Sequence, residues 1–228
     1  MRWSLLVALC GCDQVLHLDP VGSPAKPADA LVVDTAADAG PPVCDTGAPV
    51  LVDDFNDLTP CAPWGRLAMP TNAIVTQGMG ALTMVTNADE GRCDSAVTIS
   101  LPTGGLIVRV PDVPGGQGSY VTMSSVQMQA SMNFNSGLLN IALPGAGQPP
   151  VTEVGYVPGD MLYWRLVPDP ATKTIAGSYS SDGHTWMSLG NSLHVTNAIP
   201  ATIDLVLKTG SAAGVPVTTK FTYLLGCS

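Results

Sequence analysis

The side chains that could act as acids, bases or nucleophiles are sparse and scattered along this chain. Cleavage of a glycosidic bond needs two carboxyl groups that flank the bond. Glutamate occurs only at Glu90 and Glu153, each in a segment that we interpret as a loop. No serine stands in a Gly-x-Ser-x-Gly turn, and the histidines His17, His184 and His194 have no setting that suggests a catalytic triad. The sequence therefore predicts a protein without catalytic residues, and an enzyme of the glycosidase class is kept as a third alternative.

Metal-binding chemistry has one candidate segment. Asp53, Asp54 and Asp57 stand close together and could offer oxygen ligands to calcium, but they lack the ligand spacing of an EF-hand. We expect these three carboxylates to be solvated, with a structural calcium site as the alternative. Zinc is not expected, because the chain has no Cys-x-x-Cys and no histidine near a cysteine. No cofactor is predicted.

The first twelve residues have the layout of an export signal. Arg2 gives a positive start, and the apolar stretch over residues 4–9 is far shorter than the roughly 20 residues that span a bilayer. Leu9-Cys10-Gly11-Cys12 resembles the bacterial lipobox, which implies cleavage before Cys12 and attachment of diacylglycerol to its thiol. We predict a signal peptide over residues 1–11 and a membrane-lipid anchor at Cys12. The alternative is a buried N-terminal strand with two incidental cysteines.

Charge divides the chain into an acidic front and a nearly neutral remainder. The chain holds 9 Lys and Arg against 18 Asp and Glu, a net charge of −9, and residues 13–57 alone hold nine of the acids and one base. Residues 12–49 are rich in proline and alanine, so they cannot bury enough apolar surface to fold. We expect a disordered tether there; the alternative is a tail that docks through Leu31-Val32-Val33. Basic residues are too few for a nucleic-acid partner.

Residues 50–228 have the pattern of one all-β domain. Short apolar or alternating segments are separated by Gly, Pro and Asn turns, and no helical period of useful length occurs. Over 161–167, Leu162, Trp164 and Leu166 share one face, whereas Tyr163 and Arg165 share the other. The pattern predicts an antiparallel β-sandwich or barrel.

One hairpin can be predicted residue by residue. Asp182-Gly183 is a strong signal for a two-residue type I′ turn, in which both central residues have positive φ. Such a turn pairs Ser181 with His184 and places Tyr179 opposite Trp186.

Two segments resemble the concanavalin A-like lectin and glucanase domains, which include laminin-G-like modules. These are Ser178-Tyr179-Ser180-Ser181-Asp182-Gly183-His184-Thr185-Trp186 and the opening Asp53-Asp54-Phe55-Asn56-Asp57 followed by Trp64. The resemblance implies a jelly roll of two packed antiparallel sheets. The Glu-x-Asp-x-x-Glu strand of the glucanase members is absent.

Four cysteines remain beyond the lipidation segment, and three disulfide connectivities are possible. The jelly-roll resemblance places the two ends of the domain on adjacent strands, which implies a Cys44–Cys227 bond. The same resemblance places Cys61 and Cys93 in early loops, which implies that they form the second bond.

Sugar-binding surfaces combine exposed aromatic faces with polar groups. Tyr179, His184 and Trp186, or Tyr163 with Arg165, are the candidates for such a surface, although Tyr179 and Trp186 could instead fill the core. We therefore predict a non-catalytic, lipid-anchored module of the cell envelope that binds a polysaccharide. The alternative is a structural or adhesive lipoprotein that contacts envelope proteins. The outer membrane or cell surface is the favoured location, and the inner membrane stays open.

Overall fold

The computed structural model describes residues 40–68, 73–87, 90–111, 117–125, 128–143, 152–210 and 215–228. Within these ranges the chain forms eighteen β-strands and no helix. No helix in the described part is therefore long and apolar enough to cross a bilayer. Cys12, the predicted signal peptide and the apolar stretch at residues 31–33 lie outside the described residues.

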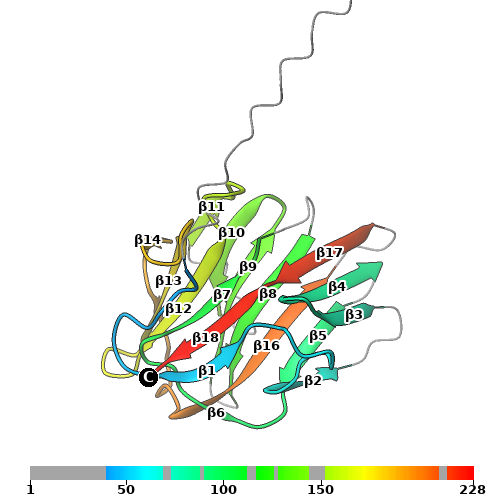
Figure 1. The fold of residues 1–228 in the computed structure, drawn as a ribbon. Helices are drawn as coiled ribbons and strands as arrows, with labels where there is room; N and C mark the ends of the chain where they lie inside the picture. The colour runs from blue at the N-terminus through cyan, green and yellow to red at the C-terminus, as the bar shows by residue number, and fades with distance from the viewer. Residues whose placement is uncertain are drawn as a thin grey trace, which may run out of the picture. The chain divides into compact units, whose positions relative to one another are not determined.

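The first sheet has seven antiparallel strands and contains both ends of the domain. In order these are β1 (Pro49–Asp53), β18 (Tyr223–Cys227), β7 (Gly105–Arg109), β12 (Tyr163–Asp169), β13 (Thr174–Ser180) and β14 (Met187–Ser188), with β15 (Leu193–His194) also paired to β13. Figure 1 shows the last strand, β18, lying between β1 and β7. The first and last strands are thus neighbours, as the jelly-roll resemblance implies.

The second sheet has eight antiparallel strands and carries the candidate site. In order these are β11 (Thr152–Gly155), β10 (Leu138–Ala142), β9 (Gln129–Asn135), β8 (Gln117–Ser124), β16 (Thr202–Gly210), β5 (Glu90–Ser95) and β2 (Gly65–Ala68), with β6 (Ile99–Ser100) paired to β16. A third, smaller sheet has the order β17 (Pro216–Phe221), β4 (Ala81–Asn87) and β3 (Ile74–Gly78).

The hydrophobic core joins side chains from all three sheets, because alternate residues of a strand point to the same face and the inward faces are apolar. Trp164 on β12 is 1% exposed and donates its indole N–H to the Met161 carbonyl at 2.9 Å. Its core partners include Leu106, Val108, Leu224, Met123, Met132, Leu139, Leu205, Leu207, Leu82 and Phe221. The fold is the antiparallel β-sandwich of jelly-roll type that the sequence predicts.

Two disulfides join the cysteines in the predicted pairs. Cys44 is bonded to Cys227 across 183 positions of sequence, and Cys61 is bonded to Cys93 across 32 positions. The second bond connects the loop before β2 to the middle of β5. The Gln77 side-chain carbonyl accepts the backbone N–H of Cys61 at 2.8 Å, which holds that loop in place.

The opening Asp-Asp-Phe-Asn-Asp segment is anchored by its two buried residues, Asp53 and Phe55. Asp53 is only 4% exposed, and its carboxylate accepts the Trp64 indole N–H and the Phe55 backbone N–H, both at 2.7 Å. Burial raises the pKa of the Asp53 carboxyl, and these two hydrogen bonds partly oppose that rise. The prediction that Asp53 is a solvated acid is therefore wrong, because the carboxylate satisfies two buried donors.

Residues 40–48, which the sequence assigned to the tether, form a strap on the outside of the seven-stranded sheet. Cys44 is tied to β18 by its disulfide, and Asp45 pairs with Arg165 of β12 at 2.9 Å. Ser228 exchanges backbone and hydroxyl hydrogen bonds with Ala48 at 2.9–3.1 Å. The folded unit thus begins before the first strand.

Candidate active site

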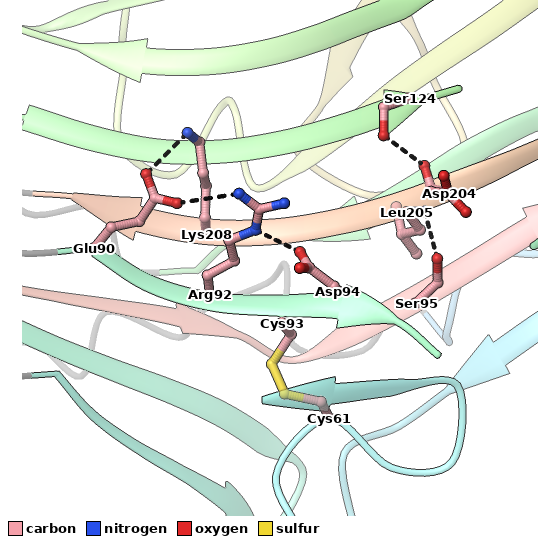
Figure 2. Close-up of polar contacts among 10 residues, drawn as sticks. All are labelled: Cys61, Glu90, Arg92, Cys93, Asp94, Ser95, Ser124, Asp204, Leu205 and Lys208. Carbon is pink, nitrogen blue, oxygen red and sulfur yellow. Dashed lines mark hydrogen bonds and ion pairs between the residues drawn. A yellow bond between two sulfur atoms is a disulfide. The ribbon is translucent and has the colours of Figure 1, made fainter. Parts of the chain in front are cut away.

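Charged side chains gather on the outer face of the eight-stranded sheet. On β5, Gly91 and Cys93 are buried, whereas Glu90, Arg92 and Asp94 point to the outside. Figure 2 shows these three side chains on one side of β5 and the Cys61–Cys93 disulfide on the other. The alternation of the strand therefore separates a polar face from the core, and the disulfide holds the strand that carries the charges.

The charges on β5 form a network with the adjacent strand. Arg92 donates its Nε–H to Asp94, and its Nη1 lies 3.7 Å from the Glu90 carboxylate. Lys208 on β16 approaches Glu90 at 3.1 Å. The hydrogen bond to Asp94 raises the pKa of the Arg92 guanidinium above its usual value, although desolvation partly offsets the effect. Arg92 consequently fixes the orientation of the Asp94 carboxylate.

A cavity of about 360 Å³ opens at one end of this face. Two carboxylates from adjacent strands line it, Asp94 of β5 and Asp204 of β16, together with Arg66 and Arg92. Residues 96–98 form a further part of its wall. Asp94 is the register partner of Val206, where the pairing of β5 with β16 ends, and Asp204 lies diagonally from Asp94, two residues further along β16.

The two carboxylates in the cavity are held differently. The backbone of Asp204 is fixed by register pairing with Ser124, and the Ser124 hydroxyl approaches the Asp204 carbonyl oxygen at 3.5 Å. The Ser95 hydroxyl accepts the backbone N–H of Leu205 at 3.0 Å (Figure 2). Within the described residues, the Asp204 carboxylate itself has no hydrogen-bond or ion-pair partner. One carboxylate is thus oriented by an arginine, whereas the other has no such partner among the described residues.

The residues that the sequence suggested for sugar binding lie on other parts of the molecule. Tyr163, Arg165 and Trp186 meet on the outer face of the seven-stranded sheet, beneath the strap. Tyr163 is only 6% exposed, and the Arg165 guanidinium stacks over Trp186 at 4.2 Å. Because the Arg165 guanidinium also pairs with Asp45 of the strap, this chain already occupies the cation that a ligand would need.

Tyr179 and His184 are separated from that cluster. Tyr179 packs against the main core, and His184 is exposed in the loop after β13. The predicted hairpin register is wrong by one residue, since Tyr179 pairs with Met187 rather than with Trp186. Only Gly183 has a positive φ in the turn, at 78°, so the type I′ geometry is not adopted.

Asp182 explains the longer turn. Its Oδ1 accepts backbone N–H groups from His184 at 2.8 Å and Thr185 at 2.7 Å, and the hydroxyl of Ser180 at 2.8 Å. Because these bonds satisfy the backbone donors within the loop, residues 181–186 do not pair as strands. The backbone donors of Thr185 and His184 hold the pKa of Asp182 well below its usual range.

Replacement of Asp182 by alanine tests this turn. Because the carboxylate has its partners only in the folded chain, it stabilises the fold above its unfolded pKa, and the effect is lost as pH falls through the lower folded pKa. We expect Asp182→Ala to reduce the free energy of unfolding by about 1 kcal/mol at neutral pH. The difference from wild type should shrink as pH falls below about 4. Urea unfolding over this pH range measures it, and a pH-independent difference would contradict the assignment.

The calcium alternative finds no site in the ranges that the structure covers. No group of three or more His, Cys, Asp or Glu side chains there could hold a metal ion. Asp53 faces two N–H donors, whereas Asp54 bonds to Asn56 at the surface. The neighbouring acids thus point to different partners.

The carboxylate site was missed because its strand was interpreted as a loop. Glu90 begins β5 and Glu153 lies on β11, so neither is in the loop setting that the sequence suggested. The signal was present as charged residues at Glu90, Arg92 and Asp94, alternating with a small residue and a cysteine. Asp204 lies on β16, and its neighbour across the sheet could not be known from the sequence.

Comparison with known proteins finds likeness in structure alone. Neither a protein-family model nor a curated protein matches the chain. SCLam, a non-specific endo-beta-1,3(4)-glucanase from family GH16, superposes with a TM-score of 0.59 at 15% identity, over 82% of this chain and 93% of its own. The apo Crh5 transglycosylase gives 0.58 at 13% identity, over 85% and 90%. A beta-1,3-glucanase from Mycobacterium marinum gives 0.53 at 11% identity, over 79% and 99%.

These matches show that the chain shares its jelly-roll fold with two glucanases and a transglycosylase. They also correct the prediction of a non-catalytic module, whether for glycans or for envelope proteins. The correction rests on the fact that chains sharing this fold over most of their length are glucanases and a transglycosylase. The absence of one sequence motif was therefore too narrow a reason to favour a module without catalysis.

Proposed function

We propose that the chain is a glycan-acting enzyme that hydrolyses or transfers glycosidic bonds at the outer face of its eight-stranded sheet. The observation that carries this proposal is the cavity in which Asp94 and Asp204 meet from adjacent strands. Two facing carboxyl groups are the functional requirement of most glycosidases. The likeness of the fold to glucanases and transglycosylases supports the same conclusion.

The proposed reaction divides the work between the two carboxyl groups. As the bond between the anomeric carbon and the linking oxygen breaks, one carboxyl group gives its proton to that oxygen. The other carboxylate assists the incoming water or sugar hydroxyl and takes up its proton, or first bonds to the anomeric carbon itself. Water as the acceptor gives hydrolysis, and a sugar hydroxyl gives transfer.

The contacts suggest which carboxyl group has which part. Asp94 is oriented by Arg92, which suits a group that must keep a fixed position beside the anomeric carbon. Asp204 has no side-chain partner in the described residues, so it is free to turn toward a leaving oxygen. We assign Asp204 as the proton donor and Asp94 as the base or nucleophile. Arg66 on β2 is the register partner of Asp94 and would contact the substrate from the side.

This arrangement departs from the glucanase motif that the sequence lacks. That motif places its acids on one strand, whereas here the carboxylates come from β5 and β16. The proposal therefore depends on the sheet register, which brings Asp94 and Asp204 to diagonal positions.

A substrate panel tests the activity. The purified protein is incubated with β-1,3-glucan, mixed-linkage β-1,3(4)-glucan and chitin oligosaccharides, and products are separated by size. We expect shorter products from hydrolysis, or both shorter and longer products from transfer, on at least one substrate. Unchanged substrates across a broad panel of linkages would contradict the proposal.

We also propose that the protein is exported and anchored to the cell envelope through lipid on Cys12. The two disulfides support an oxidising compartment, because such bonds rarely persist in the cytosol. The lipobox-like Leu9-Cys10-Gly11-Cys12 supports the anchor. In cells fed labelled palmitate, we expect wild type to carry label and Cys12→Ser to carry none, with Cys10→Ser labelled as a matched control. Label that persists on Cys12→Ser would contradict the anchor.

A further inference from the structure

One basic side chain in the wall of the cavity has no partner among the described residues. The cavity is lined by two arginines, Arg66 of β2 and Arg92 of β5. Arg92 forms ion pairs with Asp94 and Glu90. Arg66 is exposed and forms no hydrogen bond or ion pair with any residue that the structure describes. One cation of the cavity is therefore neutralised, and the other is available to an outside anion.

Arg66 is unpaired although a carboxylate lies directly opposite it. Arg66 is the register partner of Asp94, and the side chains of such a pair leave the sheet on the same face, with Cβ atoms about 4.5–5.5 Å apart. The Asp94 carboxylate instead accepts the Nε–H of Arg92. Because Arg66 and Asp94 both line the cavity, the Arg66 guanidinium is within reach of a ligand that binds beside Asp94.

The backbone that carries Arg66 is fixed by the loop before β2. Cys61 of this loop is bonded to Cys93 of β5. The Trp64 carbonyl accepts the backbone N–H of Ala96, which is part of the cavity wall, at 3.0 Å. The loop is thus tied both to β5 and to the wall. A binding group on a backbone that is already fixed loses less conformational freedom when a ligand binds.

The charges of the cavity favour an anion when the proton donor carries its proton. In that state Asp204, which we assign as the donor, is uncharged. The ion-pair network that β5 forms with Lys208 has two acids and two bases, so it has no net charge. Arg66 then leaves one positive charge in the described wall. The Ser95 hydroxyl, which accepts a backbone N–H, still has its own hydrogen to donate.

We infer that the cavity takes glycans that carry an anionic group, a carboxylate or a sulfate, and that Arg66 binds this group. The planar guanidinium can donate two parallel N–H groups to a pair of anionic oxygens. The anionic group belongs to the part of the glycan that lies beside Asp94 on the side of β2. This inference rests on the proposed function and deepens it, because it specifies the class of glycan. A neutral glycan lacks this contact and is a weaker ligand of the same cavity.

Oligosaccharides that differ only in charge test the inference. Neutral β-1,3-glucan and mixed-linkage oligosaccharides are compared with the same chains bearing carboxylates in place of their primary alcohols, and with their sulfated forms. Calorimetry measures the affinities on Asp204→Asn, which keeps the Arg92–Asp94 pair and should not consume the probes. We expect an anionic form to bind about 3- to 10-fold more tightly than its neutral parent, the range from an exposed ion pair to a charge-assisted hydrogen bond.

Two substitutions on this background assign the preference to one residue. Arg66→Gln should abolish the preference for the anionic form and leave the affinity for the neutral parent unchanged. Its melting temperature should stay the same, because Arg66 is exposed. Lys220→Gln removes the same charge from an exposed position of β17 that does not line the cavity, and it should keep the preference. The net charge of −9 repels anions at long range, so a preference for them must come from a local cation.

Four results would overturn the inference: equal affinity for neutral and anionic forms, binding of no form, a preference that persists in Arg66→Gln, or one that Lys220→Gln also abolishes. A preference for either anion supports it, and the tighter of the two identifies the group. The proposed function fails differently, because an anionic oligosaccharide then binds through Arg66 while the wild-type protein leaves every glycosidic bond intact.

Discussion

Asp94→Asn and Asp204→Asn should each lower the rate of glycosidic bond cleavage or transfer by about 10²–10⁴-fold, the usual contribution of one acid or base group. Asparagine has nearly the shape of aspartate but can neither give up nor accept a proton at neutral pH. In Asp94→Asn, Arg92 also loses the carboxylate with which it forms an ion pair. Turnover of the best substrate of the panel, measured as reducing ends or transfer products, gives the effect.

A matched substitution at the surface controls for charge. Asp160 is exposed in the turn before β12, and Asp160→Asn changes the net charge by the same amount. We expect Asp160→Asn to retain wild-type turnover, and all three variants to unfold near the wild-type temperature. Full activity in either Asp94→Asn or Asp204→Asn would remove that residue from the proposed pair.

Loss of the Cys44–Cys227 disulfide should produce the largest effect on stability. The bond closes a loop of 183 residues, and the chain-entropy estimate for a loop of that length is about 5 kcal/mol. Loss of Cys61–Cys93, which closes 32 residues, should reduce the free energy of unfolding by about 4 kcal/mol on the same basis. We expect Cys44→Ser/Cys227→Ser to show the larger fall in urea unfolding.

The strap gives this prediction a second readout. Without the disulfide, residues 40–48 keep the Asp45–Arg165 pair and the Ser228 contacts with Ala48, which are exposed and individually weak. Proteolysis should then cut the strap while the sandwich persists. Equal stability of the double variant and wild type in urea would show that the disulfide constrains little of the unfolded chain.

The fold could be predicted because its signals are local. Short alternating strands such as 161–167 carry their period in the sequence, and Trp164 and Leu166 lie in the core as expected. The disulfide pairs followed from the resemblance, since β1 and β18 are adjacent. The last two strands, β17 and β18, divide at Thr222 between the small sheet and the seven-stranded sheet, which no local pattern marks.

The candidate site could not be predicted because its parts meet only through the register. Glu90 and Asp94 are of types depleted in strands, and β5 contains none of the β-branched residues that identify a strand. Asp94 and Asp204 are 110 positions apart, and only their places on paired strands make them neighbours. Sequence reasoning instead favoured the aromatic residues, which the structure places elsewhere.

The most direct test of the account compares reaction products from wild type and from the double variant Asp94→Asn/Asp204→Asn. Both are incubated with a neutral β-linked oligosaccharide of defined length, and the products are identified by mass spectrometry. We expect wild type to convert the oligosaccharide into shorter or longer ones, and the double variant to return it unchanged. Products that form equally with both proteins, or with neither, would contradict the assignment of this face as the active site.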